Sequence, residues 1–263
     1  METHPIAPPP PALIDTLTEP LRAGLEATRL ALTFERLLRA APRGEGHPVL
    51  VLPSYGTGDG GTRPLRRFLE RLGYDAPEPS LGRNVDRGEL RIRRVEDAAR
   101  FRASQVDRVV DRVRAVHRAT GQRVSLVGWS MGGLFALDAS QRVPELVRSA
   151  VTLGSPFGDP RGTSMFGLMR VLNGSRVPVE EQDFGVWLDG MRLATQSVPI
   201  TVIHSDRDGI VGRTIARLPE APCIRHVPVS SSHLGFAAHP EVFLEVAEAL
   251  ARAKRGDPPT GRA

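Results

Sequence analysis

Hydrophobic residues gather in five short runs from residue 47 onward, and segments with helical periodicity separate these runs. Runs of this length with little polar alternation are typical of strands that are covered on both faces. Strands are therefore predicted at Val49–Leu52, Val124–Val127, Val147–Leu153, Ile200–Ile203 and Ile224–Val229. Helices are predicted at residues 63–72, 95–119, 131–142 and 240–253. Such alternation favours an α/β fold with a mostly parallel central sheet, right-handed crossovers and helices on both faces.

The segment before the first predicted strand has a different pattern. Leu17, Leu21, Leu25, Thr28 and Leu32 recur at helical spacing. This spacing predicts one or two amphipathic helices over residues 14–40. We expect them to pack outside the main sheet and to cover an apolar face.

The domain organisation follows from these patterns. Residues 1–45 form an N-terminal extension that begins with a proline-rich stretch, and residues 46–255 form the main domain. Residues 157–198 break the alternation of strand and helix and are interpreted as an inserted cap segment. Residues 256–263 are expected to be a flexible tail, and neither this tail nor the proline-rich residues 1–12 are expected to carry chemistry.

Composition narrows the class of protein. A chain of 263 residues with 40% hydrophobic content can bury a full core as one domain. The net charge of +5 is small, and the arginines that carry it are spread along the chain without interleaved aromatic residues. This pattern argues against a nucleic-acid partner.

Cysteine usage and the N-terminus predict a cytoplasmic protein. The single cysteine, Cys223, has no partner for an internal disulfide. The first residues lack the basic start and apolar run of a secretory signal. No stretch reaches the roughly 18 apolar residues of a membrane span.

The chemistry is concentrated at the end of the second predicted strand. There the sequence reads Gly128-Trp129-Ser130-Met131-Gly132, with the spacing Gly-x-Ser-x-Gly, and a helical segment follows. A nucleophile on a sharp strand-to-helix turn needs small residues two positions to either side. The free amides at the start of the helix can stabilise an oxyanion. Ser130 is therefore the predicted nucleophile.

A serine hydroxyl needs a base, and the base needs a carboxylate to orient it. The loop after the fourth predicted strand offers two acids, Asp206 and Asp208. We assign Asp208, which begins Asp-Gly-Ile-Val, and leave Asp206 as a loop-capping residue. His233 follows the last predicted strand, where the base must lie to reach Ser130. His204 is the rival base.

The oxyanion requires a second amide from the loop after the first predicted strand. The backbone N–H groups of Tyr55 and Met131 are assigned to this role. The alternative for Tyr55 is that it only forms a wall of the pocket.

These motifs resemble those of the α/β-hydrolase superfamily, from about residue 47 to residue 252. Four segments look like bacterial lipases and esterases: Val-Leu-Val-Leu-Pro-Ser-Tyr-Gly, Pro-Leu-Arg-Arg-Phe-Leu-Glu-Arg-Leu-Gly-Tyr, Gly-Trp-Ser-Met-Gly-Gly and Ser-Ser-His-Leu-Gly-Phe. The resemblance implies Ser130 as nucleophile, Asp208 as acid, His233 as base and transfer of an acyl group to water. Ser54 departs from the pattern, because many relatives have glycine there. Thioesterases and acyltransferases share this fold, so they remain alternatives to a carboxylesterase.

The cap segment suggests where a small-molecule or lipid-like ester would bind. Met165, Leu168, Met169 and Leu172 fall on one face of a predicted helix. This face either lines an acyl pocket or packs inward as structural cover. The predicted pocket residues are Trp129, Met165 and Met169.

Other functions have weaker support. Residues 56–61 match Gly-x-Gly-x-x-Gly, and Glu78 lies near the distance of a ribose ligand, so a nicotinamide-dependent oxidoreductase is a rival. Three residues separate the strand from Gly56, however, and Thr62 stands where a Walker loop requires lysine. An inactive binding protein would lack a triad member, and none is missing. No metal-ligand spacing is present, so neither a metal nor another cofactor is expected.

Overall fold

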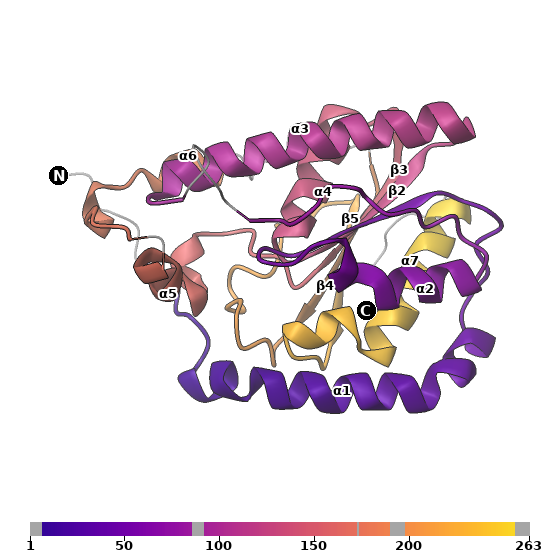
Figure 1. The fold of residues 1–263 in the computed structure, drawn as a ribbon, viewed down its shortest axis with the longest axis horizontal. Helices are drawn as coiled ribbons and strands as arrows, with labels where there is room; N and C mark the ends of the chain where they lie inside the picture. The colour runs from indigo at the N-terminus through magenta and orange to yellow at the C-terminus, as the bar shows by residue number, and fades with distance from the viewer. Residues whose placement is uncertain (1–6, 86–91, 173, 190–197, 256–263) are drawn as a thin grey trace.

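The computed structural model describes residues 7–85, 92–172, 174–189 and 198–255 (Figure 1). Its α-helices are α1 (Leu13–Ala40), α2 (Arg63–Arg71), α3 (Val95–Thr120), α4 (Met131–Arg142), α5 (Met165–Leu172), α6 (Phe184–Asp189) and α7 (Pro240–Arg255). Its strands are β1 (Val49–Leu52), β2 (Val124–Trp129), β3 (Val147–Leu153), β4 (Ile200–Ser205) and β5 (Ile224–Val229). Short 3-10 helices are η1 (Asp59–Thr62), η3 (Pro160–Gly162), η4 (Val179–Glu181) and η5 (Leu234–Ala237). Each predicted element of the main domain is present within a few residues of its expected bounds.

The five strands form one parallel sheet in the order β1-β2-β3-β4-β5. The register pairs Val51 with Val127 and Val127 with Val151. Since all strands run the same way, their carboxyl ends meet at one edge of the sheet. The loops after β1, β2, β4 and β5, which carry the predicted site residues, all leave from that edge.

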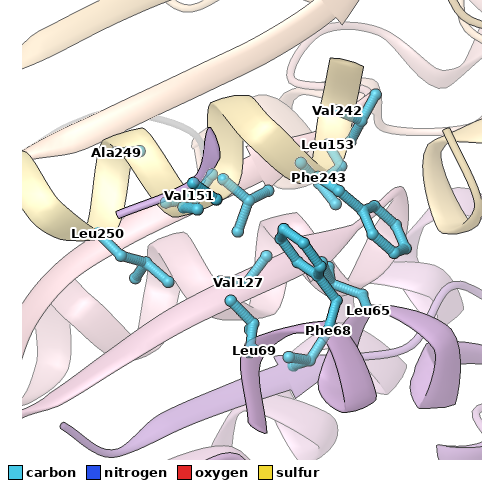
Figure 2. Packing of buried hydrophobic residues seen from close by; sticks show 14 of the residues in the cluster. Leu65, Phe68, Leu69, Val127, Val151, Leu153, Val242, Phe243, Ala249 and Leu250 are labelled. Carbon is cyan, nitrogen blue, oxygen red and sulfur yellow. The ribbon is translucent and has the colours of Figure 1, made fainter. Parts of the chain in front are cut away.

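Alternate residues of each strand point to opposite faces, and each face has its own core. Val51, Val127 and Val151 pack with residues of α1, α2 and α7. Figure 2 shows Phe68 of α2 packed against Phe243 of α7 over the strands, and the two ring centroids are 5.3 Å apart. On the other face, strand residues pack against α3 and α4. This double cover explains why the strands are apolar without alternation.

Helix α1 differs from its prediction in orientation. It is one helix along one side of the molecule (Figure 1), but the leucines of the predicted stripe face solvent. Leu17, Leu21, Leu25 and Leu32 are 60% to 82% exposed. The buried residues are Glu19, Leu30, Leu37 and Leu38 on the opposite face. The helix does pack outside the sheet and cover an apolar face, through Leu30, Leu37 and Leu38. The expectation that the predicted leucine stripe forms this inward face is wrong.

The described part of the cap segment consists of η3, α5, η4 and α6, and residues 190–197 lie outside the described residues. Phe184 and Trp187 of α6 are buried and belong to the same apolar cluster as Val95 and Ala98 of α3. The predicted apolar face of α5 is divided, because Leu168 is 48% and Leu172 63% exposed. The cap is therefore packed on α3 through α6, and it is bonded to the loop after β4 through Gly162 and Ser164.

None of the described helices combines the length and the apolar character that crossing a membrane requires.

Candidate active site

Ser130 lies at a strained turn between β2 and α4. Its backbone has φ 54° and ψ −120°, a conformation that a non-glycine residue rarely adopts. A Cβ atom on Gly128 would overlap the carbonyl of Gly132, and one on Gly132 would come within 2.5 Å of Leu52 O. The flanking glycines therefore allow β1, β2 and α4 to meet closely around the serine.

Asp208 and His233 form a buried pair between the loops after β4 and β5. Asp208 Oδ2 lies 2.8 Å from His233 Nδ1. Asp208 Oδ1 accepts hydrogen bonds from the amides of Ile210 (2.8 Å) and Val211 (2.7 Å). These bonds fix both carboxylate oxygens, so one of them stays aimed at the imidazole.

Asp206 and His204, the alternatives for the acid and the base, do not take part in the Asp208–His233 contact. The Asp206 side chain is 68% exposed and faces Arg213 at 3.7 Å. The His204 ring lies beside His226, with 6.0 Å between ring centroids, rather than beside Asp208. Burial lowers the pKa of His204, which favours its neutral form. Of the predicted acids and bases, Asp208 and His233 are thus the pair that the structure brings into contact.

The environment of His233 favours its charged form. Burial of the ring acts against the imidazolium, but the carboxylates of Asp208 and Glu19 outweigh this effect and raise the pKa of His233 above its usual value. The Trp129 indole N–H donates to the carbonyl of His233 at 3.1 Å. Phe236 contacts the ring edge to face, with 6.3 Å between centroids. The ring is therefore confined on several sides.

Ser130 and His233 border one cavity, which has a volume of about 500 Å³. Ser130, Met131, Tyr55 and His233 all border it, so the residues predicted as nucleophile, base and oxyanion donors share one space. Most of the other wall residues are apolar. They include Ile92, Val95, Ala98, Pro156, Pro160, Met165, Phe166, Met169, Trp187, Ile210, Val211 and Leu234.

The predicted pocket residues are divided by the structure. Met165 and Met169 border the cavity. Trp129 does not, because its ring lies in the core against His233, and this part of the pocket prediction is wrong. Leu168 and Leu172 also lie outside the wall.

Glu19 is a residue of the site that the sequence reading missed. Glu19 borders the cavity, is 1% exposed, and accepts hydrogen bonds from amides of the two loops that carry Asp208 and His233. The signal that could have found it is a pair of acids, Glu19 and Glu26, seven residues apart on the face of α1 opposite the leucines.

The glycine-rich stretch 56–61 leads through η1 into α2. Its first amide, that of Gly56, donates to Asn84 O at 2.7 Å, and Asn84 Nδ2 donates to Pro53 O at 3.1 Å. These bonds hold the loop that carries Tyr55. The described strands follow one another without a reversal of order, whereas dinucleotides bind where the order reverses. Among the described residues, no three His, Cys, Asp or Glu side chains gather as a metal site would require.

A parallel sheet with a strained serine between strand and helix, and an Asp–His pair at the same sheet edge, is the arrangement of an α/β-hydrolase. The model of the alpha/beta hydrolase fold family matches residues 40–182, more than half of the 263-residue chain. The chain therefore belongs to the alpha/beta hydrolase fold family. A search of curated proteins finds no match.

Solved structures agree with this fold. The mature lipase BlEst2 of Bacillus licheniformis is similar with a TM-score of 0.54 and 16% identity, over 80% of this chain and 94% of that one. The structure of TT1662 from Thermus thermophilus gives a TM-score of 0.55 and 16% identity, over 81% and 91%. A structure from work on LipS and LipT, two metagenome-derived lipolytic enzymes, gives 0.54 and 15%, over 82% and 96%. At these identities the likeness establishes the fold alone.

Proposed function

We propose that this chain is a serine esterase that hydrolyses carboxylic esters through an acyl-enzyme on Ser130. One observation carries the proposal: Ser130, at its strained turn, and His233, which is hydrogen-bonded to Asp208, border the same largely apolar cavity. A nucleophile, an oriented base and an adjoining pocket for the substrate are components that acyl transfer requires.

In the first half of the reaction, His233 Nε2 takes the proton from Ser130 Oγ as the oxygen attacks the ester carbonyl. Asp208 holds the Nδ1 proton and stabilises the imidazolium that forms. The amides of Tyr55 and Met131 stabilise the oxyanion. The imidazolium then gives its proton to the departing alcohol, which leaves the acyl group on Ser130.

In the second half, water replaces the alcohol. His233 takes a proton from water as the water oxygen attacks the acyl carbonyl, and the serine oxygen recovers that proton when the acid departs. The reaction consumes one ester and one water and releases one acid and one alcohol, so it needs no cofactor.

The apolar wall supports an acyl chain longer than acetate. Each buried methylene contributes about 0.8 kcal/mol. Medium-chain esters should therefore have higher specificity constants than acetyl esters until the space beside Met165 and Met169 is filled.

The direct test is labelling with a fluorophosphonate probe, followed by hydrolysis of acetyl, butyryl and octanoyl nitrophenyl esters. The expected result is stoichiometric labelling that maps to Ser130 and turnover that rises with chain length. An unlabelled, inactive but folded protein would overturn the proposal. Faster cleavage of a matched thioester than of the oxygen ester would instead favour a thioesterase.

The acyl-pocket part of the proposal has its own test. Met165→Ala and Met169→Ala should each lower the ratio of octanoyl to acetyl specificity constants, by about tenfold if two methylene contacts are lost. Leu168→Ala is the matched control, since this residue of the same helix is 48% exposed and outside the cavity wall. An unchanged ratio together with a lower melting temperature would identify the methionines as structural cover.

A further inference from the structure

We propose that Glu19, on the N-terminal helix α1, is a positioning residue that holds the acid loop and the base loop of the proposed triad in one fixed arrangement. The inference rests on the proposed function, because it assigns a task to a residue outside the triad. It also gives the helix of the N-terminal extension, which the sequence predicts only as cover for an apolar face, a part in the reaction.

The contacts of one carboxylate carry the argument. Glu19 Oε1 accepts hydrogen bonds from Gly209 N (2.7 Å) and His233 N (2.9 Å), and Oε2 accepts one from Leu234 N (2.9 Å). Gly209 directly follows Asp208 in the chain. The same carboxylate therefore joins the backbone beside the acid to the backbone of the base, more than 20 residues apart in sequence.

The burial of Glu19 makes these bonds strong. The residue is 1% exposed, so little water competes for the carboxylate oxygens. Arg22 Nη2, one turn along α1, lies 3.0 Å from Oε1 and compensates part of the buried charge. Three amides and one guanidinium give the carboxylate the partners that a buried charge requires.

Glycines in both loops provide an independent observation. A Cβ atom on Gly209 would lie 2.9 Å from Glu19 Oε1 and would overlap the Asp15 carbonyl. A Cβ atom on Gly235 would overlap the carboxylate of Glu26. Both loops thus have a glycine where α1 approaches most closely, as expected if their shape is fitted to the helix.

Neighbouring bonds strengthen the attachment. Glu26 accepts from Ser232 N (2.9 Å) and Ser232 Oγ (2.6 Å), on the residue before His233. Thr16 Oγ1 donates to Gly209 O at 2.6 Å. Glu19 differs from these residues in two ways. It accepts hydrogen bonds from both loops, and its negative charge helps to raise the pKa of the His233 imidazole.

That charge has a measurable consequence. Desolvation of the His233 ring lowers its pKa, while Asp208 and then Glu19 raise it, and the net shift is upward. Hydrolysis needs the neutral imidazole as base, so activity is lost as pH falls through this raised pKa. Removing the negative charge of Glu19 should lower the pKa of His233 and move the ascending limb of the kcat/KM profile to lower pH. A purely structural role would reduce activity without moving this limb.

The experiment compares Glu19→Gln with the wild-type full chain on a nitrophenyl ester. We expect kcat to fall about a hundredfold with a smaller change in KM, since misplacement of a catalytic group by about 1 Å costs that much. The ascending limb should move to lower pH. Glu35→Gln is the control, because Glu35 is an exposed acid of the same helix that pairs with exposed Arg71 at 3.2 Å. An unchanged rate and profile in folded Glu19→Gln would overturn the inference.

Two further variants separate charge from placement. Glu19→Asp keeps the charge but withdraws the carboxylate by one methylene, so kcat should fall while the limb stays in place. Arg22→Met keeps Glu19 but removes its compensating cation, so the limb should move to higher pH. This variant tests the inference even if Glu19→Gln does not fold, and an unmoved limb would contradict it. If the wild type neither hydrolyses esters nor reacts with the phosphonate probe, the proposed function fails, which is a different result from an active wild type with insensitive variants.

Discussion

The predicted nucleophile and the predicted acid–base pair of this α/β-hydrolase are held in place by different contacts. The position of Ser130 is fixed by residues next to it in sequence, because Gly128 and Gly132 let the strand and helix on either side of it meet closely. Asp208 and His233 lie on loops that are fixed by a helix about 190 residues earlier in the chain, through Glu19. One half of the site depends on local backbone geometry, and the other depends on a long-range contact.

This difference determines which changes each half tolerates. The turn at Ser130 directly follows a strand of the central sheet. Substitutions there should therefore lower either the catalytic rate or the stability of the whole core. The loops of Asp208 and His233 are attached to α1 by a few hydrogen bonds, so they should respond to small changes on that helix. Three predictions test this contrast.

The largest effect is expected for Ser130→Ala. Loss of the nucleophile should reduce kcat by on the order of a million-fold, while the melting temperature stays close to that of the wild type. Calorimetry and single-turnover kinetics measure the two quantities. Phosphonate labelling that persists in this variant would exclude Ser130 as the nucleophile.

The second prediction separates the two acids of one loop. Asp208→Asn should lower kcat by roughly ten-thousand-fold, because an amide favours the wrong tautomer of His233. Asp206→Asn should lose little, since the Asp206 carboxylate is exposed and pairs with an exposed arginine, Arg213. The same assay on both proteins decides the assignment, and a reversed order of losses would disprove it.

The smallest effect concerns the fit between α1 and the acid loop. Gly209→Ala should lower stability by about 1–3 kcal/mol, because its Cβ has no room beside Asp15 and Glu19. Thermal unfolding should show a decrease of several degrees. Gly24→Ala is the control. Gly24 lies on α1, and no atom lies within 4 Å of the Cβ that this substitution adds. A Gly209→Ala protein as stable and active as this control would mean that the fit is not required.

The main-domain fold could be predicted from the sequence because local patterns determine it. The strands β1, β3 and β5 begin and end where their apolar runs do. The pattern Gly-x-Ser-x-Gly also indicated the turn that the structure has at Ser130. The family and the parallel sheet are confirmed, whereas the catalytic roles remain predictions.

Helix α1 shows where such reasoning fails. Periodicity identified the helix but not the face that it turns inward, because an apolar stripe is assumed to be buried. Here the inward face combines Leu30 and Leu37 with acids that find hydrogen-bond partners on distant loops. Those partners depend on tertiary contacts, which no local pattern of Glu19 encodes. The same limit applies to Trp129, whose ring is turned to the core.

The close approach at Gly209 and Gly235 also bears on how this sequence can diverge. A larger residue at position 209 requires α1 to move away, and once the helix has moved, Glu19 no longer reaches either loop. The acid and the glycine should therefore be gained and lost together in evolution, since residues in contact change in a correlated way. Relatives with acids seven residues apart ahead of the first strand should keep both glycines. Relatives without that helix should be free to vary them.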